Sequence, residues 1–451
     1  MGCSKSSNVK VMPPPPIIIK HNEIKMNLSL NNLKELNKKI NILFKHNEEE
    51  LNESNVELYI NEEKKNFSFF FIFNSLNNSL NNSLNYKIKL KFKNPITDCS
   101  QMFSCCKHLE LIDLSLFDTG KVTNMEKMFY HCSNLKKIIF DENNTTNVTN
   151  MSLMFASCTN LEELDLSNVN TENVTNMSYL FNKCEKLTKL NISNLNTQNV
   201  INMSHMFGEC KQLTKIDISN LNTQNVNDMS YMFNKCENLT ELDISNLNTQ
   251  NVTDMSSLFN KCGKLNNLNL VNLVTTKVTN MKKMFNKCLV LENIDLSNFN
   301  TENVKEMVKM FSYCPVKELD LSHLNTKNVT NMKGMFMGCK NLTTIDLSPL
   351  DTTNVKIMSD LFSLCENLKE IDLKPLKTDN IEDINYMFNE CTNLMYIDLS
   401  NVNFFGHIEY HVDYMFWNCF SLKQIVLNEN NKIIINRALN ISNINPQILI
   451  K

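Results

Sequence analysis

Apolar and polar residues along most of this chain follow one pattern that recurs about every 26 residues. From Leu161 to Lys186 the sequence reads LEELDLSNVNTENVTNMSYLFNKCEK, and similar units begin at Leu187 and Leu213 without a gap. Repeats of this length are typical of solenoids, in which each unit buries its apolar side only against its neighbours. We therefore expect a stack of similar coils.

The apolar spacing changes within each unit and predicts two kinds of local structure. Leu164 and Leu166 alternate with polar residues, which favours a short strand with one buried face. The stretch from Met177 to Cys184 has apolar residues at positions i, i+3, i+4 and i+7, which is typical of one face of a helix. Each coil is thus predicted to be strand, turn, helix and turn.

One cysteine recurs at the same place in each unit and gives the number of coils. The spacing is 26 residues except for 25 before Cys339 and 28 before Cys419. The series comprises Cys106, Cys132, Cys158, Cys184, Cys210, Cys236, Cys262, Cys288, Cys314, Cys339, Cys365, Cys391 and Cys419. These 13 positions predict about 13 coils, with an inserted loop from Phe404 to Tyr410.

The 16 cysteines do not indicate a disulfide framework. In a stack of coils the recurring thiols would project in parallel, which is the wrong geometry for pairing. We interpret them as small buried packing groups in a reducing compartment. Thr171, Thr197, Thr223 and Thr249 are likewise expected to line up as a ladder.

Two segments flank the repeats. Alternation with period two predicts five strands, at Ile24 to Leu30, Ile40 to Phe44, Val56 to Ile60, Phe67 to Phe73 and Tyr86 to Phe92. After Leu427 the pattern fails, and the last residues are expected to cover the end of the stack, with Ile433 and Ile435 in a final strand. The predicted parts are an N-terminal spacer (1–21), a small β-rich domain (22–94), the solenoid (95–427) and a C-terminal cap (428–451).

The recurring motifs N-V-T-N-M-x-x-M-F-x-x-C and L-x-x-L-D-L-S resemble those of the BspA-type leucine-rich repeat family of surface proteins from bacteria and protists. The resemblance spans roughly residues 95 to 427. It implies a leucine-rich-repeat solenoid of the α/β class that binds other proteins and has no catalytic residues. Two units depart from the motif, since Ile139 and Phe140 replace Asp-Leu and Val271 replaces Ser.

Charge and motif content exclude several other functions. The formal net charge is −3 and basic residues are not massed in one segment, so nucleic acid is not an expected partner. None of the 7 glycines belongs to a phosphate-binding loop, and no HExxH or GxSxG string occurs. We expect neither an enzyme nor a cofactor, and no small-molecule substrate.

The outward side chains of the predicted strands form a column of carboxylates. Because like charges at strand spacing repel each other, something must offset them. They could be solvated or bonded to neighbouring Ser, Thr and Lys, they could face a basic protein partner, or they could bind calcium, although the motif has no glycine-containing calcium loop. Asp113 begins the column and Asn191 and Asn269 interrupt it. The candidate partner-binding residues are Asp165, Asp217, Asp243, Asp295, Asp320, Asp346, Asp372 and Asp398.

A second group of potential metal ligands lies in the first two units. It comprises Cys99, Cys105, Cys106, His108, His131 and Cys132. Their spacing matches no common zinc module, and several occupy core positions of the repeat. No metal site is therefore expected.

The first residues fit the template for N-myristoylation. Gly2 would carry the myristate and Cys3 a palmitate, which together would give stable membrane attachment. No apolar leader and no membrane-spanning stretch is evident. The Asn-X-Ser/Thr strings at Asn173 and Asn176 fall on residues expected to hydrogen-bond to turns, which also favours the cytosol.

Besides a passive, rapidly varying repeat protein with no single ligand, two functional hypotheses follow. The first is a lipid-anchored scaffold that recruits proteins to the cytosolic face of a membrane. The alternative is a cell-surface adhesin, as the family resemblance implies.

Overall fold

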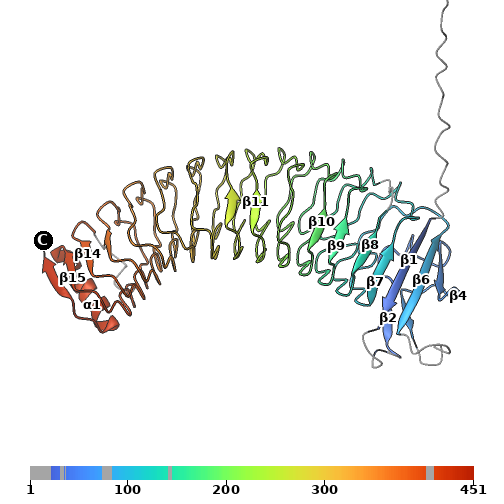
Figure 1. Ribbon diagram of the computed structural model, residues 1–451, viewed down its shortest axis with the longest axis horizontal. Helices are drawn as coiled ribbons and strands as arrows, with labels where there is room; N and C mark the ends of the chain where they lie inside the picture. Colours follow the sequence, from blue (N-terminus) through green and yellow to red (C-terminus); the bar gives the residue numbers. More distant parts are fainter. Residues whose placement is uncertain are drawn as a thin grey trace, which may run out of the picture.

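The computed structural model shows a curved solenoid with a group of longer strands at its N-terminal end (Figure 1). It describes residues 22–30, 35, 37–73, 84–140, 145–402 and 411–450. The predicted loop from Phe404 to Tyr410 and the acylation sites Gly2 and Cys3 lie outside these residues.

Most coils contribute a short strand to a parallel ladder, as predicted. Strand β9 (Glu163–Asp165) pairs with β10 (Lys189–Asn191), with Leu164 opposite Leu190. The offset of 26 residues between paired positions confirms the period of the repeat. The other solenoid strands are β7 (Leu109–Asp113), β8 (Lys137–Ile139), β11 (Glu241–Asp243), β12 (Asn267–Asn269), β13 (Glu370–Asp372), β14 (Tyr396–Leu399) and β15 (Gln424–Leu427).

The helix predicted for each coil is wrong. The stretch from Met177 to Cys184 forms overlapping turns, in which the N–H of Leu180 donates to the carbonyl of Met177 at 3.3 Å. Alternate N–H groups donate to the next coil instead. For example, the N–H of Tyr179 donates to the carbonyl of Ser204 at 2.8 Å. A helix would use all these donors internally. The turns bury the same apolar positions while every second N–H holds the adjacent coil.

These turns place two residues of each coil in the left-handed region of backbone space. In one coil they are Tyr179 and Lys183, with φ of 58° and 61°. Of the 26 equivalent positions, all described, only Gly334 and Gly338 are glycines, and none is Val, Ile or Thr. The absence of β-branched residues fits their high cost at positive φ.

Columns of identical side chains fill the core. Thirteen phenylalanines, from Phe103 to Phe416, stack along the solenoid, and the ring centroids of Phe207 and Phe233 are 5.4 Å apart. All 13 recurring cysteines are buried and free, which confirms their interpretation as packing groups. The threonine ladder is also confirmed, since the hydroxyl of Thr171 donates to the next coil at 2.8 Å.

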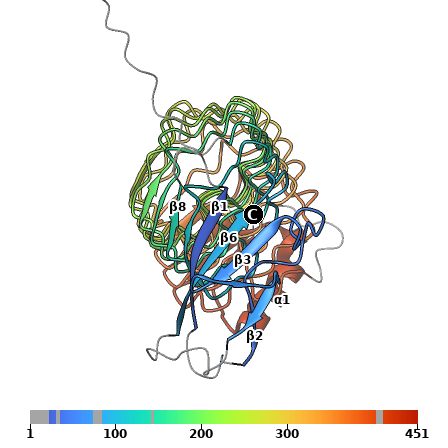
Figure 2. The same ribbon diagram turned by 90° about the vertical axis from the view of Figure 1, so that its right-hand side faces the viewer.

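The N-terminal strands join the solenoid edge to edge. They are β1 (Glu23–Ser29), β2 (Lys39–Asn41), β3 (Val56–Ile60), β4 (Glu63–Lys65), β5 (Phe70–Ile72) and β6 (Asn85–Phe92). The five predicted strands are present, and β4 is additional. Strand β1 pairs antiparallel with β7, Met26 opposite Ile112, so one sheet of order β4-β3-β6-β1-β7-β8 continues into the first coils (Figure 2).

The C-terminal end differs from its prediction. Ile433 and Ile435 lie in helix α1 (Lys432–Ser442), which follows a short 3₁₀ turn (Glu429–Asn431). The buried residues of α1 recur at helical spacing from Ile435 to Ser442, which explains why this segment is not a strand. The final strand is β16 (Gln447–Ile450), which pairs in parallel with β15.

Candidate protein-binding groove

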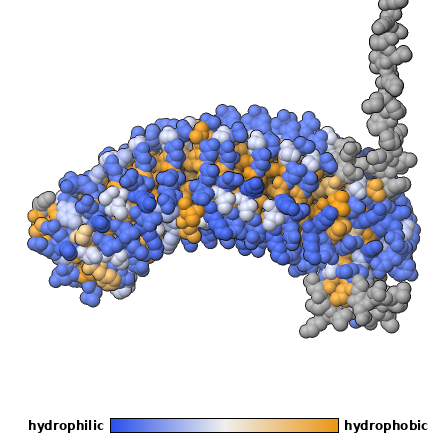
Figure 3. Space-filling view, in the orientation of Figure 1, coloured by the Kyte–Doolittle hydropathy of each residue, from blue (hydrophilic) through white to orange (hydrophobic). Residues whose placement is uncertain are grey.

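The outward side of the solenoid strands, called the strand face below, carries an open groove of about 1140 Å³ that runs across β8 to β12. Apolar residues from the middle of successive coils form its floor: Leu190 and Ile216 are half-buried, and Ile138, Leu164 and Leu242 are buried. Figure 3 shows a band of apolar residues along the middle of the solenoid, between hydrophilic ones.

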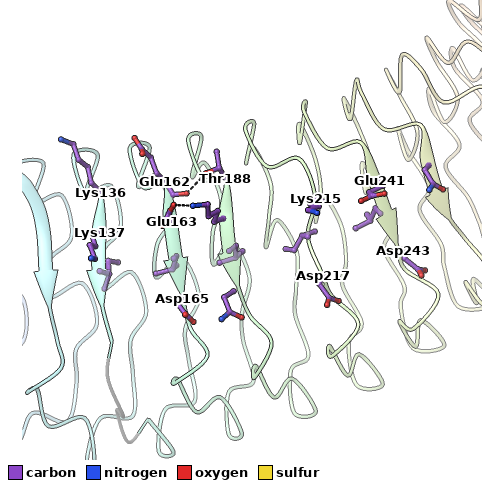
Figure 4. Close-up of a pocket in the computed structure, with 18 of the residues that line it drawn as sticks. Lys136, Lys137, Glu162, Glu163, Asp165, Thr188, Lys215, Asp217, Glu241 and Asp243 are labelled. Carbon is purple, nitrogen blue, oxygen red and sulfur yellow. Dashed lines mark hydrogen bonds and ion pairs between the residues drawn. The ribbon is translucent and has the colours of Figure 1, made fainter.

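Charged side chains border this apolar strip on both sides (Figure 4). The lining includes four lysines, Lys136, Lys137, Lys189 and Lys215, and six carboxylates, Glu162, Glu163, Asp165, Asp217, Glu241 and Asp243. Within this lining one ion pair forms, between Lys189 and Glu163. Lys136 binds Glu110 outside the groove at 2.7 Å. Carboxylates exceed lysines, so the groove is acidic.

The aspartates that end the strands have a structural role. Asp165 Oδ1 accepts a hydrogen bond from the backbone N–H of Ser167 at 2.9 Å, and the hydrogen bonds from Ser167 lower the pKa of this carboxyl group. Asn191 makes the same contact with Ser193 at 3.2 Å, which explains why asparagine can interrupt the column. One carboxylate oxygen therefore closes a turn, and the second remains for other contacts.

The eight predicted site residues do not form one site. Asp165, Asp217 and Asp243 line the groove, and Figure 4 shows them in a row along one side of it. Asp372 and Asp398 line a second hollow of about 290 Å³ near the C-terminal end. Asp295, Asp320 and Asp346 line neither hollow.

Asp398 is the most strongly bound member of the column. Lys374 Nζ lies 3.1 Å from its Oδ2, and Ser400 N–H donates to its Oδ1 at 2.9 Å. Burial raises the pKa of Asp398, but the hydrogen bonds from Ser400 and Lys374 outweigh it and bring the pKa to about 2. Its charge is therefore neutralised within the chain.

The sequence interpretation considered Lys189 and Lys215 only as neighbours of the aspartates and did not include the charged residues on the other side of the apolar strip in the candidate site. They include Lys137, Glu163, Lys189, Lys215 and Glu241, which occupy one position in five successive coils. Comparing the repeats would have revealed this position, because its residue changes from coil to coil while the fold stays the same. An outward position that varies in this way is available for recognition.

Among the described residues, no group of three His, Cys, Asp or Glu side chains could hold a metal ion. The six cysteines and histidines of the first coils therefore do not converge on a common point. No described helix has the length and apolarity needed to span a bilayer.

Comparison with known proteins places the repeats in a family. The model of the family described as "Mycoplasma protein of unknown function, DUF285" matches residues 97–215, 202–322 and 314–430. A search of curated proteins found no match.

Several solved structures resemble the chain at low identity. A leucine-rich repeat protein from Bacteroides ovatus is 16% identical, covering 82% of this chain and 90% of its own, with a TM-score of 0.39. A leucine rich cell surface protein from Faecalibacterium prausnitzii is 15% identical, covering 77% and 86%, with a TM-score of 0.34. The TLR13–ssRNA13 complex is 16% identical, covering 75% and 62%, with a TM-score of 0.16.

The family model covers well over half of the chain, and its matches coincide with the repeats that carry the BspA-type motifs. The chain belongs to the DUF285 family and is similar to BspA-type leucine-rich repeat surface proteins.

Proposed function

We propose that this protein is a non-catalytic binding solenoid that holds an extended, basic segment of a partner protein in the groove on its strand face. The observation that supports this most directly is the composition of the groove, in which six carboxylates and four lysines border an apolar strip. Lys215 and Glu241 form no ion pair within the described part of the chain, so their charges are available to a ligand. Such complementary charges confer specificity and speed association.

The dimensions of the groove suit an extended peptide. The groove crosses six successive coils, from β8 to β12, and at ~4.8 Å per interval it extends over roughly 20–25 Å. A polypeptide strand rises ~3.3 Å per residue, and six to eight residues would span this length. Apolar side chains of the partner would contact the strip, while its basic side chains would face the carboxylates.

We further propose display at the cell surface, the alternative named from the sequence. Its support is the resemblance of the repeat motifs to those of BspA-type surface proteins. Anchoring through Gly2 and Cys3 has no support from the comparisons, and both residues lie outside the described part of the chain. Labelling of intact cells with an impermeant reagent tests this placement. The acylated cytosolic form would give the opposite result. The protein would not be labelled in intact cells, and the Gly2→Ala variant would be lost from the membrane fraction.

Selection from a library of random linear peptides tests the binding proposal. Peptides that bind the full chain should be enriched in Lys and Arg, and their affinity should fall about tenfold or more in the variant E241K/D217N/D243N, in line with the loss of several charge contacts. The Asn substitutions keep the turn contact that Asn191 already makes. The control is Glu172→Lys, an exposed position away from the groove. Enrichment of acidic peptides, or equal binding by the groove variant and wild type, would contradict the proposal.

A further inference from the structure

A second charged surface lies on the overlapping turns. The turn face is the set of positions aligned with Ser178, Tyr179 and Lys183 in every coil, of which the first is buried in several coils. In four consecutive coils, from Ser256 to Gly338, six of these twelve positions are lysine and none is acidic. This lysine patch comprises Lys261, Lys282, Lys283, Lys287, Lys309 and Lys333. It stands out in a chain whose formal net charge is −3.

The stacking of the coils brings these lysines together. The N–H of Lys283 donates to the carbonyl of Val308 at 2.8 Å, and that of Lys309 donates to the carbonyl of Lys333 at 2.8 Å. Lys283 and Lys309 therefore belong to one column, separated by the ~4.8 Å spacing of adjacent strands. Lys261 and Lys287 occupy a second column in the same way, since the N–H of Lys261 donates across to the next coil at 2.7 Å.

Carboxylates of the chain do not neutralise the patch. Among the described residues, Lys333 alone of the six forms an ion pair, with Asp360 at 3.6 Å, and the carboxyl group of Asp360 also interacts electrostatically with Lys309. At the border of the patch, Asp254 accepts hydrogen bonds from the N–H of Ser256 at 2.7 Å and the amide of Asn280 at 3.1 Å. Glu306 also lies at the border, in the coil of Lys309.

Two turn-face lysines of earlier coils have carboxylate partners, although Lys183 has none among the described residues. Lys235 pairs with Glu209 at 3.0 Å, and Lys127 pairs with Glu126 at 2.6 Å. The other five lysines of the patch form no ion pair among the described residues, so ammonium groups of like charge lie in neighbouring coils, and bound anions would relieve their repulsion.

We propose that the lysine patch binds a segment of an anionic polymer that carries repeated phosphate or sulfate groups. The patch spans four coils, or about 14 Å at ~4.8 Å per interval, which suits two or three such groups. Carboxylates follow on both sides of it along the turn face, at Glu209 and Asp360. A flat membrane would contact these carboxylates together with the lysines, whereas a polymer segment can avoid them.

Tyr313 is the one aromatic residue among the twelve positions, and its surroundings indicate recognition of charge rather than of nucleic-acid bases. A Cβ atom added at Gly338 would lie 2.6 Å from the ring of Tyr313, so the backbone of the next coil covers one face of the ring. On the side of the preceding coil, Lys287 Nζ lies 5.1 Å from the ring centroid. Neither face of Tyr313 is open for a base to stack, which is the usual contact with single-stranded nucleic acid.

Binding of the full chain to inorganic polyphosphate and to heparin, measured over a range of salt concentrations, tests the proposal. The test variant is K283Q/K287Q/K309Q, in which glutamine is tolerated in place of Lys283 and Lys309 because Gln101 occupies the equivalent position with φ of 57°. The matched control is K137Q/K189Q/K215Q, which removes three lysines from the strand face. Thermal unfolding should show that both variants fold.

We expect wild-type binding to at least one of the two polymers, with an affinity that decreases as salt is added. The patch variant should bind about tenfold or more weakly, and its slope of log affinity against log salt should fall by ~2, because each contact with a flexible polyanion contributes ~0.7. The control variant should bind like wild type.

Four results would overturn the proposal: no binding by wild type, equal weakening by the control variant, binding to anionic vesicles but to neither polymer, or tighter binding of a single-stranded oligonucleotide than of polyphosphate of equal charge. The groove on the strand face is not involved, so these results and those of the peptide selection are independent.

Discussion

The thiol of Cys184 donates a hydrogen bond to the backbone carbonyl of Phe155 at 3.2 Å, across the boundary between two coils. The same contact recurs along the ladder, for example from Cys210 to Phe181 at 3.2 Å. The recurring cysteine is therefore both a packing group and a link between adjacent coils.

Replacement of Cys184 should separate these two roles. Cys184→Ala leaves the carbonyl of Phe155 without its donor and opens a small cavity, so the free energy of unfolding should fall by about 1–3 kcal/mol. Cys184→Ser keeps a donor of similar size and should cost less than alanine. Urea unfolding followed by circular dichroism gives the comparison. A serine variant less stable than the alanine variant would show that packing of the sulfur matters and the hydrogen bond does not.

The buried thiols should make the protein sensitive to alkali. Burial raises the pKa of Cys158 and of Cys236 from 9.0 to about 12. Since the folded state favours the protonated thiols, their stabilising contribution is complete below pH 9 and is lost as the pH rises toward 12. The free energy of unfolding should therefore decrease over this range. At pH 8 a thiol reagent should modify these cysteines only after unfolding, and rapid modification of the native ladder would contradict the assigned burial.

The left-handed positions of the turns should tolerate glycine and reject β-branched residues. Lys183 has φ of 61°. Lys183→Val should destabilise the protein by about 1–3 kcal/mol, because a β-branched side chain is strained at positive φ, whereas Lys183→Gly should be neutral or stabilising. Thermal unfolding of the two variants provides the measurement. Equal stability would mean that a helix is the better description of this segment.

The pair formed by Lys374 and Asp398 should contribute to stability in a defined pH range. The folded-state pKa of Asp398 is lowered from 3.8 to about 2, so the contribution is present above pH 3.8 and is lost as the pH falls toward 2. Asp398→Asn keeps the acceptor for Ser400 and removes the charge. It should destabilise the protein at pH 7 but not near pH 2. Asp346→Asn, whose carboxylate has no lysine partner among the described residues, is the control and should show a smaller effect at pH 7.

A buried ladder of asparagine side chains ends at Asn286, and the equivalent residue of the next coil is Ser312. Asn260 donates to Asn234 and Asn286 donates to Asn260, each at 2.6 Å. The Oδ1 of Asn286 and the hydroxyl of Ser312 in the next coil have no hydrogen-bond partner among the described residues. Ser312→Asn should extend the ladder and stabilise the protein by ~1 kcal/mol. A variant no more stable than Ser312→Ala would argue against this extension.

The sequence predicted the parts of the fold that depend on repetition. The ladder of Cys184 and its equivalents, the period of 26 residues and the strand around Leu164 are all present. From Met177 to Cys184 the apolar spacing could not distinguish a helix from overlapping turns. Turns with i to i+3 hydrogen bonds bury apolar residues at the same spacing as a helix. The distinguishing signal was weaker, namely the absence of β-branched residues at the left-handed positions.

The groove was less predictable than the fold. The aspartates were noticed because they recur, yet recurrence reflects their contact with the turn, as in Asp165 and Ser167. The residues that give the groove its character, such as Glu163 and Lys215, differ from coil to coil. Their proximity depends on the stacking register, which a single repeat does not contain.

The overlapping turns also give the two ends of the solenoid different chemistry, because their outgoing N–H groups all point toward the C-terminal end. At the N-terminal end, where no coil precedes, Phe44 N–H donates to the carbonyl of Met102 at 2.9 Å. At the other end, the N–H groups of Val412, Tyr414 and Phe416 have no acceptor among the described residues. The solenoid therefore has a direction, with backbone acceptors at its N-terminal end and donors at its C-terminal end. A strand that extends the C-terminal end must offer carbonyl oxygens to this row of N–H donors.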